Sequence, residues 1–253
     1  MNGAQQPQLN FLFYAFLLIT AMGSTSLFAA EVSVAVTSNF DFTLDELKQE
    51  FEALSGHKVI AVPGPSAQHY GEILEGAAYD IFLSEDEMRP EALEKQGRII
   101  PDSRFTYANA RLVLWSIDNR KLTAETLSLG EFEFLAIANP RLSPYGNAAR
   151  EILEAMGSWD NLQEKLVIGE NIGQTYHFGI SGEVDMALIA FSQIIFGKFL
   201  QAGSYWLIPE NLYTPIKLQG VRLSNNKAAK EFIDFMKSPR GKSIIQSNGF
   251  SVP

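Results

Sequence analysis

Apolar residues along this chain follow two alternating spacings, one typical of strands and one typical of helices. From Glu31 onward, three short apolar runs predict strands: VSVAV (32–36), HKVIAV (57–62) and YDIFLS (79–84). A segment with helical periodicity follows each run, and Thr43 with Glu46 forms a capping-box pattern that predicts where the first of these helices starts. Three successive strand–helix units predict an α/β layer, a largely parallel doubly wound sheet with helices on both faces.

The second half of the chain repeats this organisation with its own elements. Strands are predicted for RLVLWSI (111–117), FLAIAN (134–139), EKLVIG (164–169), VDMALIAF (184–191) and TPIKLQGVRL (214–223). Helices are predicted for NAAREILEAMG (147–157), NKAAKEFIDFMK (226–237) and SPRGKSIIQ (238–246). We expect two lobes, each with its own doubly wound sheet. Lobe I is expected to comprise residues 31–108 and 215–253, because the last segment returns to it, and lobe II to comprise residues 109–214.

The N-terminal segment is not expected to belong to either lobe. FLFYAFLLITAM (11–22) is too short to span a bilayer and suits the apolar region of a secretory signal, which runs to about 7–15 residues. We therefore predict that residues 1–30 are a signal peptide and that residues 31–253 are exported. An uncleaved anchor is the alternative, because MNGAQQPQLN carries no Lys or Arg before the apolar run.

Composition and charge exclude several classes of function. The chain has 20 Lys and Arg against 29 Asp and Glu, a net charge of −9, which argues against nucleic acid as a partner. Cysteine is absent, so thiol catalysis, Cys-ligated zinc, iron–sulfur clusters and disulfides are excluded together. The three histidines lie far apart, without the spacing of metal ligands. We expect no cofactor, no cation site and no enzymatic activity.

Four loops that follow predicted strands share one chemistry. They are Thr37-Ser38-Asn39, Gly64-Pro65-Ser66, Pro144-Tyr145-Gly146 and Asn171-Ile172. All are small or carry hydroxyl and amide groups, all are uncharged, and each lies at or just before a predicted helix start. Helix N-termini favour anions, and ligands of doubly wound sheets bind at the carboxyl ends of strands. The set indicates a bound oxyanion, although each residue taken alone is equally typical of a turn or a helix cap.

The residues also carry a family resemblance. The segments VSVAVTSNFDFTLDEL, GPSAQHYGEILEGAAYDIFLSED, ANPRLSPYGNAAREILEAMGSWDNL, GENIGQTYHF, VDMALIAFSQ and FIDFMKSPRGKSIIQSNGF resemble periplasmic molybdate-binding proteins of ABC importers, in order and spacing, from about residue 31 to the C-terminus. The resemblance implies a two-lobed class II periplasmic-binding-protein fold that holds molybdate or tungstate in the cleft between the lobes. It also implies a periplasmic location and delivery of the anion to a membrane permease.

Transferred residue by residue, the family's contacts to the oxyanion fall on a small set of positions. They are Ser38, Asn39, Ser66, Tyr145 and the backbone N–H of Ile172. The chain departs from the family pattern twice. Ala190 stands where some members contribute a tyrosine, so that hydrogen bond is absent or comes from Tyr145, and Asn139 replaces an acidic residue in a turn.

Anion chemistry favours a site built from hydrogen-bond donors alone. Molybdate and tungstate are fully ionised dianions at neutral pH, whereas phosphate retains a proton and calls for a carboxylate acceptor, which none of the four loops provides. Arg141 and Arg150 are expected to be solvated.

Three other interpretations stay open at this stage. In the first, the bound oxyanion is sulfate or thiosulfate instead of molybdate. In another, Ser66 and His69 form a hydrolase pair, although no orienting acid is evident. In the third, the acidic run Glu85-Asp86-Glu87 binds a metal ion, although such a run is more typical of a solvated helix start. We expect a monomer, because no association pattern is visible.

Overall fold

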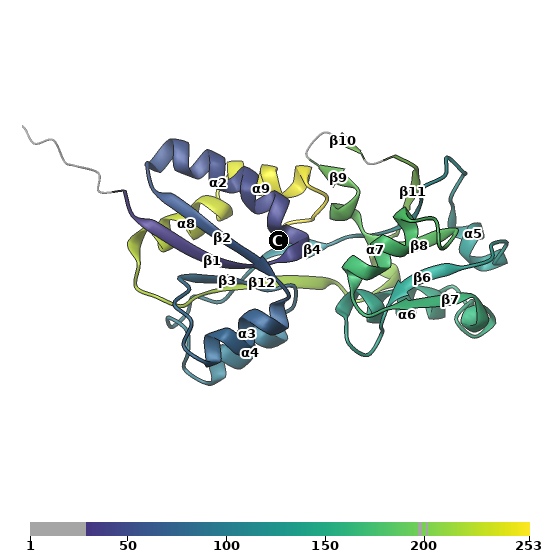
Figure 1. Cartoon of the computed structure of the whole chain (residues 1–253), viewed down its shortest axis with the longest axis horizontal. Coiled ribbons are helices and arrows are strands. Elements are labelled where there is room, and N and C mark those ends of the chain that lie inside the picture. Colours follow the sequence, from purple (N-terminus) through teal and green to yellow (C-terminus); the bar gives the residue numbers. More distant parts are fainter. Residues whose placement is uncertain (1–28, 197–198, 201) are drawn as a thin grey trace, which may run out of the picture.

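The computed structural model describes residues 29–196, 199–200 and 202–253 (Figure 1). Residues 1–28 fall outside this range, so the predicted signal peptide concerns a segment that is almost wholly outside the described residues. Within the described residues, no helix is long and apolar enough to cross a membrane.

The first sheet defines lobe I and combines segments from both ends of the chain. Its order is β2-β1-β3-β12-β4, with β1 parallel to β2 and β3, and β12 antiparallel to β3 and β4. The strands are β1 (Glu31–Thr37), β2 (Lys58–Gly64), β3 (Ile81–Leu83), β4 (Phe105–Ala110) and β12 (Ile216–Arg222). Because β12 lies between β3 and β4, the sheet is completed only by residues close to the C-terminus.

Helices cover both faces of this first sheet. On one face lie α2 (Asp41–Ser55), α8 (Lys227–Lys237) and α9 (Pro239–Ser247), and on the other α3 (Ser66–Leu74) and α4 (Met88–Lys95) (Figure 1). The short 3₁₀ helix η1 (Ser38–Phe40) connects β1 to α2. The predicted doubly wound layer is therefore confirmed for lobe I.

The second sheet defines lobe II, with the order β11-β5-β8-β6-β7. Its strands are β5 (Leu112–Ser116), β6 (Leu135–Ala138), β7 (Leu166–Gly169), β8 (Met186–Ala190) and β11 (Ser204–Leu207). Its helices are α5 (Ala124–Leu129), α6 (Pro144–Ala155) and α7 (Ile172–Ile180), with 3₁₀ turns η2 (Asp160–Lys165), η3 (Phe191–Gln193) and η4 (Glu210–Leu212) and a small hairpin of β9 (Ile195–Phe196) and β10 (Phe199–Leu200). Every residue of β5, β6 and β8 is buried, as expected for central strands covered on both faces.

The chain passes between the two sheets twice. β4 ends at Ala110 and β5 begins at Leu112, and the return passes through η4 to β12 at Ile216. The division into residues 31–108 with 215–253 and residues 109–214 stays a prediction, although Asn109 and Ala110 pair with β12 within the first sheet.

Two helix starts and one whole strand differ from the sequence-based expectation. Helix α2 begins at Asp41, so Thr43 lies inside it and is buried rather than capping it. Helix α6 begins at Pro144 instead of Asn147, because proline is well suited to the first turn. Strand β4, FTYANA, was not predicted, since its mixed sequence has no clear alternation.

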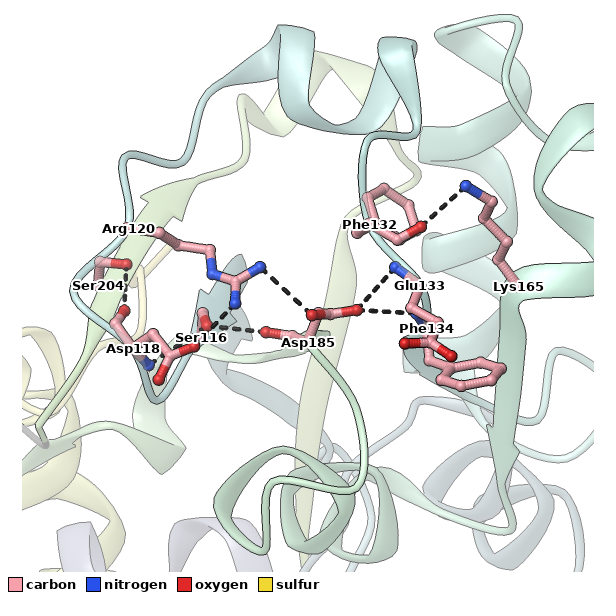
Figure 2. A network of polar contacts seen from close by, with 9 residues as sticks. All are labelled: Ser116, Asp118, Arg120, Phe132, Glu133, Phe134, Lys165, Asp185 and Ser204. Atoms are coloured by element: carbon pink, nitrogen blue, oxygen red, sulfur yellow. Dashed lines mark hydrogen bonds and ion pairs between the residues drawn. The ribbon is translucent and has the colours of Figure 1, made fainter.

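Far from lobe I, a polar network joins the start of β8 to the segment before β6 (Figure 2). The carboxylate of Asp185 accepts the backbone N–H groups of Glu133 at 2.7 Å and Phe134 at 3.0 Å, and pairs with Arg120 at 3.5 Å. The Ser116 hydroxyl donates to the Asp185 carbonyl at 2.7 Å. Burial acts to raise the pKa of Asp185, but the N–H donors and Arg120 outweigh it and hold the pKa below its ordinary value.

Candidate functional site

A cavity of about 420 Å³ lies between the two lobes and is lined from both. Lobe I contributes the end of β1, η1, the first turn of α2 and the loops after β2 and β3, and lobe II contributes the start of α7 and η3. The lining residues are Thr37, Ser38, Asn39, Phe42, Pro65, Glu85, Asn171, Ile172, Gly173, Tyr176, Ser192 and Gln193. Neither Lys nor Arg occurs among these described residues, so an anion here would be held by neutral donors.

The loop after β1 is ordered by its own side chains. The Thr37 hydroxyl donates to Oδ1 of Asn39 at 3.1 Å, which leaves the amide nitrogen of Asn39 as a donor. That nitrogen donates to the hydroxyl of Tyr145 on α6, so a direct hydrogen bond connects the lobes. Ser38 is exposed and lines the cavity beside Asn39.

Tyr145 lies behind Asn39 and is only 1% exposed. Burial raises the pKa of Tyr145 well above the ordinary tyrosine value, and the nearby negative charge of Glu85 adds to this, so the hydroxyl stays protonated. Gly146 permits this placement, because a Cβ there would lie 2.4 Å from the Ala138 carbonyl oxygen at the end of β6. The first turn of α6 therefore starts directly against the strand end, with Tyr145 aimed at lobe I.

Ser66 begins α3 and is completely buried. Its hydroxyl oxygen accepts the backbone N–H of Glu85 at 3.1 Å and thereby joins the loop after β2 to the loop after β3. Its neighbours Pro65 and Glu85 line the cavity, whereas Ser66 itself lies just behind that lining.

The N-terminus of α7 faces lobe I across the cavity. Asn171 caps the helix, its side-chain oxygen accepting the Gln174 N–H at 2.9 Å. Ile172 and Gly173 follow as the first helical residues, whose N–H groups have no acceptor within a helix. Gln193 fixes this end by donating to the Ile172 carbonyl at 3.0 Å and accepting the Ala190 N–H at 3.0 Å. The positive end of the helix dipole therefore points at the cavity.

The structure thus brings the five predicted site residues to one place, with different degrees of access. Ser38, Asn39 and Ile172 line the cavity, while Tyr145 and Ser66 lie directly behind it, in contact with Asn39 and Glu85. Ala190 has no side-chain donor to offer a ligand, and its backbone N–H donates to Gln193. At Asn139, the amide oxygen accepts the Arg141 N–H at 2.9 Å and so closes the turn between β6 and α6.

Several lining residues were missed in the sequence. Ser192 is the most informative, because its hydroxyl is buried with no hydrogen-bond partner in the described part of the chain. It follows the end of β8 by two residues, which is the same topological position that pointed to the other loops. Tyr176 and Phe42 add aromatic surface at the rim and carry no sequence signal of their own.

Glu85 is the exception to a lining made of donors only, so the expectation of a site without a carboxylate is not met. It is half-buried at the cavity, in the loop after β3, which was not among the four loops singled out. The other two members of the acidic run turn elsewhere, since Asp86 pairs with Arg89 and Glu87 pairs with Lys217 at 3.5 Å. The three carboxylates do not converge, and no group of metal-ligating side chains occurs among the described residues.

The hydrolase interpretation finds no geometric support. Nδ1 of His69 contacts Glu72 at 3.2 Å, so an acid does orient this imidazole. Its Nε2, however, has no partner among the described residues and packs against Gly64, while the Ser66 hydroxyl is engaged with Glu85. Ser66 and His69 share no hydrogen bond in the described structure.

A larger hollow of about 520 Å³ lies on the outer face of lobe I, between α2 and α9. Its charged lining consists of Glu46, Glu50 and Arg240, with Arg240 already paired to Glu50. This acidic hollow does not suit an oxyanion.

Comparison with known proteins agrees with the geometry. The family model of the bacterial extracellular solute-binding proteins matches residues 32–251. The chain is 39% identical to the molybdate-binding protein ModA of Rhodobacter capsulatus over 226 residues, covering 88% of each chain. It is 37% identical to ModA of Azotobacter vinelandii over 247 residues, covering 93% of this chain and 97% of the relative.

A solved structure shares the same fold. The periplasmic molybdate-binding protein of Azotobacter vinelandii superposes with a TM-score of 0.78 at 36% identity, over 88% of this chain and 99% of that one. These relatives are binding proteins rather than enzymes, and the two-lobed α/β architecture expected from the sequence is confirmed. The chain belongs to the bacterial extracellular solute-binding proteins, in the family of the molybdate-binding proteins.

Proposed function

We propose that the protein captures molybdate, and also tungstate, in the cavity between its lobes and delivers the anion to an ABC importer. One observation carries this proposal: neutral donors from several strand and helix ends of both lobes converge on one cavity that has no Lys or Arg in its described lining. A tetrahedral dianion only accepts hydrogen bonds, so such a set satisfies it without a counter-cation.

The proposed contacts are Ser38, Asn39, Ser66, Tyr145 and the N–H of Ile172. Ser38, Asn39 and Ile172 already line the cavity. Tyr145 and Ser66 each retain a hydroxyl hydrogen, because their oxygens accept hydrogen bonds from Asn39 and from Glu85. These residues bind the oxo groups and do not coordinate the metal atom.

The cellular setting follows from the family and from the apolar N-terminal segment. We propose that residues 1–30 direct export, that the protein works in the periplasm, and that a membrane permease of a molybdate ABC transporter receives the anion. The net charge of −9 makes nucleic acid an unsuitable partner. We further propose that residues 31–253 form a monomer, for which light scattering at micromolar concentration is expected to give the mass of one chain; a doubled mass would contradict it.

Titration calorimetry with a panel of anions tests the proposed function. Molybdate and tungstate are expected to bind with one site per chain, and sulfate, thiosulfate and phosphate to bind at least about a hundredfold more weakly, a difference of about 2.8 kcal/mol. Tight binding of sulfate or thiosulfate with no binding of molybdate would overturn the assignment in favour of another tetrahedral oxyanion.

A further inference from the structure

Glu85 places an ionisable group where a dianion is proposed to bind. It is the one carboxyl among the described residues that line the cavity. Its backbone N–H is held by Ser66, so the loop that carries it is tied to the proposed contacts. Its carboxylate takes part in no hydrogen bond or ion pair within the described structure, although the neighbouring acids are both paired.

The surroundings of Glu85 provide little to stabilise a negative charge. On its own segment lie Asp86 and Arg89, which pair with each other. From β4 comes Tyr107, whose hydroxyl donates to the Ser84 carbonyl at 3.0 Å, and from α6 comes Tyr145. The charge of Glu85 contributes to raising the pKa of both tyrosines, and neither hydroxyl donates to its carboxylate in the described structure.

Across the cavity lie Asn171, Ile172 and Gly173 at the N-terminus of α7, whose positive dipole end favours the ionised carboxylate but carries no full charge. Burial and the neighbouring Asp86 already raise the pKa of Glu85 in the empty cavity, whereas Arg89 lowers it in part. A dianion arriving a few ångströms away adds two further like charges, which disfavour the ionised carboxyl more strongly still.

We propose that Glu85 couples anion capture to proton uptake: it takes one proton from solvent as the dianion binds, and its neutral O–H then joins the donors around the oxo groups. This proposal rests on the proposed function of the same site. Protons and charges balance in this step, because one carboxylate and one solvent proton become one carboxylic acid and the bound anion is unchanged. Reciprocity then requires that affinity falls as pH rises between the pKa of Glu85 in the empty protein and its pKa in the complex.

Calorimetry with sodium molybdate tests this coupling in the full mature chain. Titrations from about pH 6 to about pH 8.5, each in two buffers with different ionisation heats, give the number of protons taken up per anion. The parent protein is expected to take up close to one proton and to lose up to about tenfold in affinity per pH unit over part of this range. Molybdate remains a dianion throughout, so the ligand supplies no proton.

Two variants assign the proton to its residue. Glu85→Gln is expected to show no proton uptake and a flat affinity, and to bind more tightly than the parent at the highest pH. The matched control Glu87→Gln, on the exposed neighbour paired with Lys217, is expected to behave like the parent. Should Glu85→Gln melt much earlier, Glu85→Ala provides the same readout.

The outcomes separate the two proposals. Molybdate binding with no proton uptake in the parent, or unchanged uptake in both Glu85 variants, would overturn the coupling and leave the proposed function intact. Absence of molybdate binding to the parent at every pH would instead overturn the proposed function.

Discussion

Asn39 joins the lobes through its hydrogen bond to Tyr145 and also lines the cavity. Asn39→Ala removes one donor to a charged ligand, so we expect a loss of about 1.5–3 kcal/mol of binding free energy, or roughly ten- to a hundredfold in affinity. Titration calorimetry with molybdate measures it, and a melting curve of the empty protein shows how much stability is lost.

Asn147→Ala is the matched control for Asn39. Asn147 lies two residues beyond Tyr145 on α6, outside the cavity lining, and its amide donates to Glu151 at 2.7 Å. It is expected to bind molybdate as the parent does. If Asn39→Ala also binds like the parent while melting earlier, Asn39 is a structural residue and the site assignment fails there.

At single positions, the sequence predicted the site where one rule applies, namely a small polar residue directly after a strand. That rule finds Ser38, Asn39 and Asn171, which line the cavity, and Ile172 follows Asn171 as the first residue of α7. It fails for Glu85, because a run of acidic residues resembles a solvated helix start until its partners are known. It also passes over Ser192, whose buried hydroxyl becomes conspicuous only once its lack of partners is visible in the described structure.

At the scale of elements, the N-terminus of α7 offers a direct test of backbone binding. Ile172 is the first helical residue after the cap Asn171, and proline is well tolerated at that position. Ile172→Pro removes the N–H while preserving the helix, so we expect molybdate affinity to fall about ten- to a hundredfold. Calorimetry on the purified variant measures this loss.

Two further substitutions separate the N–H from the side chain of Ile172, which is buried. Ile172→Val is expected to bind almost normally. Ile172→Ala loses as much packing as the proline variant but retains the N–H, so its affinity is expected to stay close to that of the parent. An equal loss of molybdate affinity in the alanine and proline variants would show that binding depends on the packing of the Ile172 side chain and not on its N–H.

The Asp185 network (Figure 2) provides a stability test in lobe II, because none of its residues lines the cavity. Asp185→Asn weakens two hydrogen bonds to backbone N–H groups and an ion pair, so we expect a loss of about 1–3 kcal/mol in the free energy of unfolding at neutral pH. Asp118→Asn, on the exposed partner of the same Arg120, is expected to cost at most about 1 kcal/mol. Urea denaturation measures both.

The pH dependence of this effect has a defined direction. The pKa of Asp185 is lowered in the folded protein from an ordinary value of 3.8, so its contribution is complete above that value and is lost as pH falls through the lowered pKa. The difference between parent and Asp185→Asn is therefore expected to shrink in acid, below about pH 4. A difference that grows in acid would contradict this account.

Elements were predicted well where burial is continuous and poorly where tertiary contacts decide. The continuous apolar runs of β5, β6 and β8 predict these strands directly, because all their residues are buried. Strand β4 is stabilised by pairing with β12, more than a hundred residues away in the chain, which no local pattern reports. The start of α2 depends on Phe40 and Thr43 packing into the core rather than on a capping side chain.

For the whole molecule, ligand binding is expected to raise stability because the anion contacts both lobes. At a hundredfold excess over the dissociation constant, a ligand that binds only the folded protein contributes about 2.7 kcal/mol. For a chain of this length that corresponds to a rise in melting temperature of roughly 5–10 °C. Differential scanning fluorimetry is expected to show this with molybdate and with tungstate, and an equal rise with phosphate would contradict the proposed selectivity.

The late entry of β12 into the first sheet has a consequence for biogenesis. Lobe II is contiguous in sequence and can fold as soon as it is synthesised, but the sheet of lobe I lacks the strand between β3 and β4 until residues 216–222 arrive. Until then, those two strands present unpaired edges, which are prone to aggregation. A nascent chain therefore cannot complete lobe I before residues 216–222 have left the ribosome, even though lobe II precedes them in the chain.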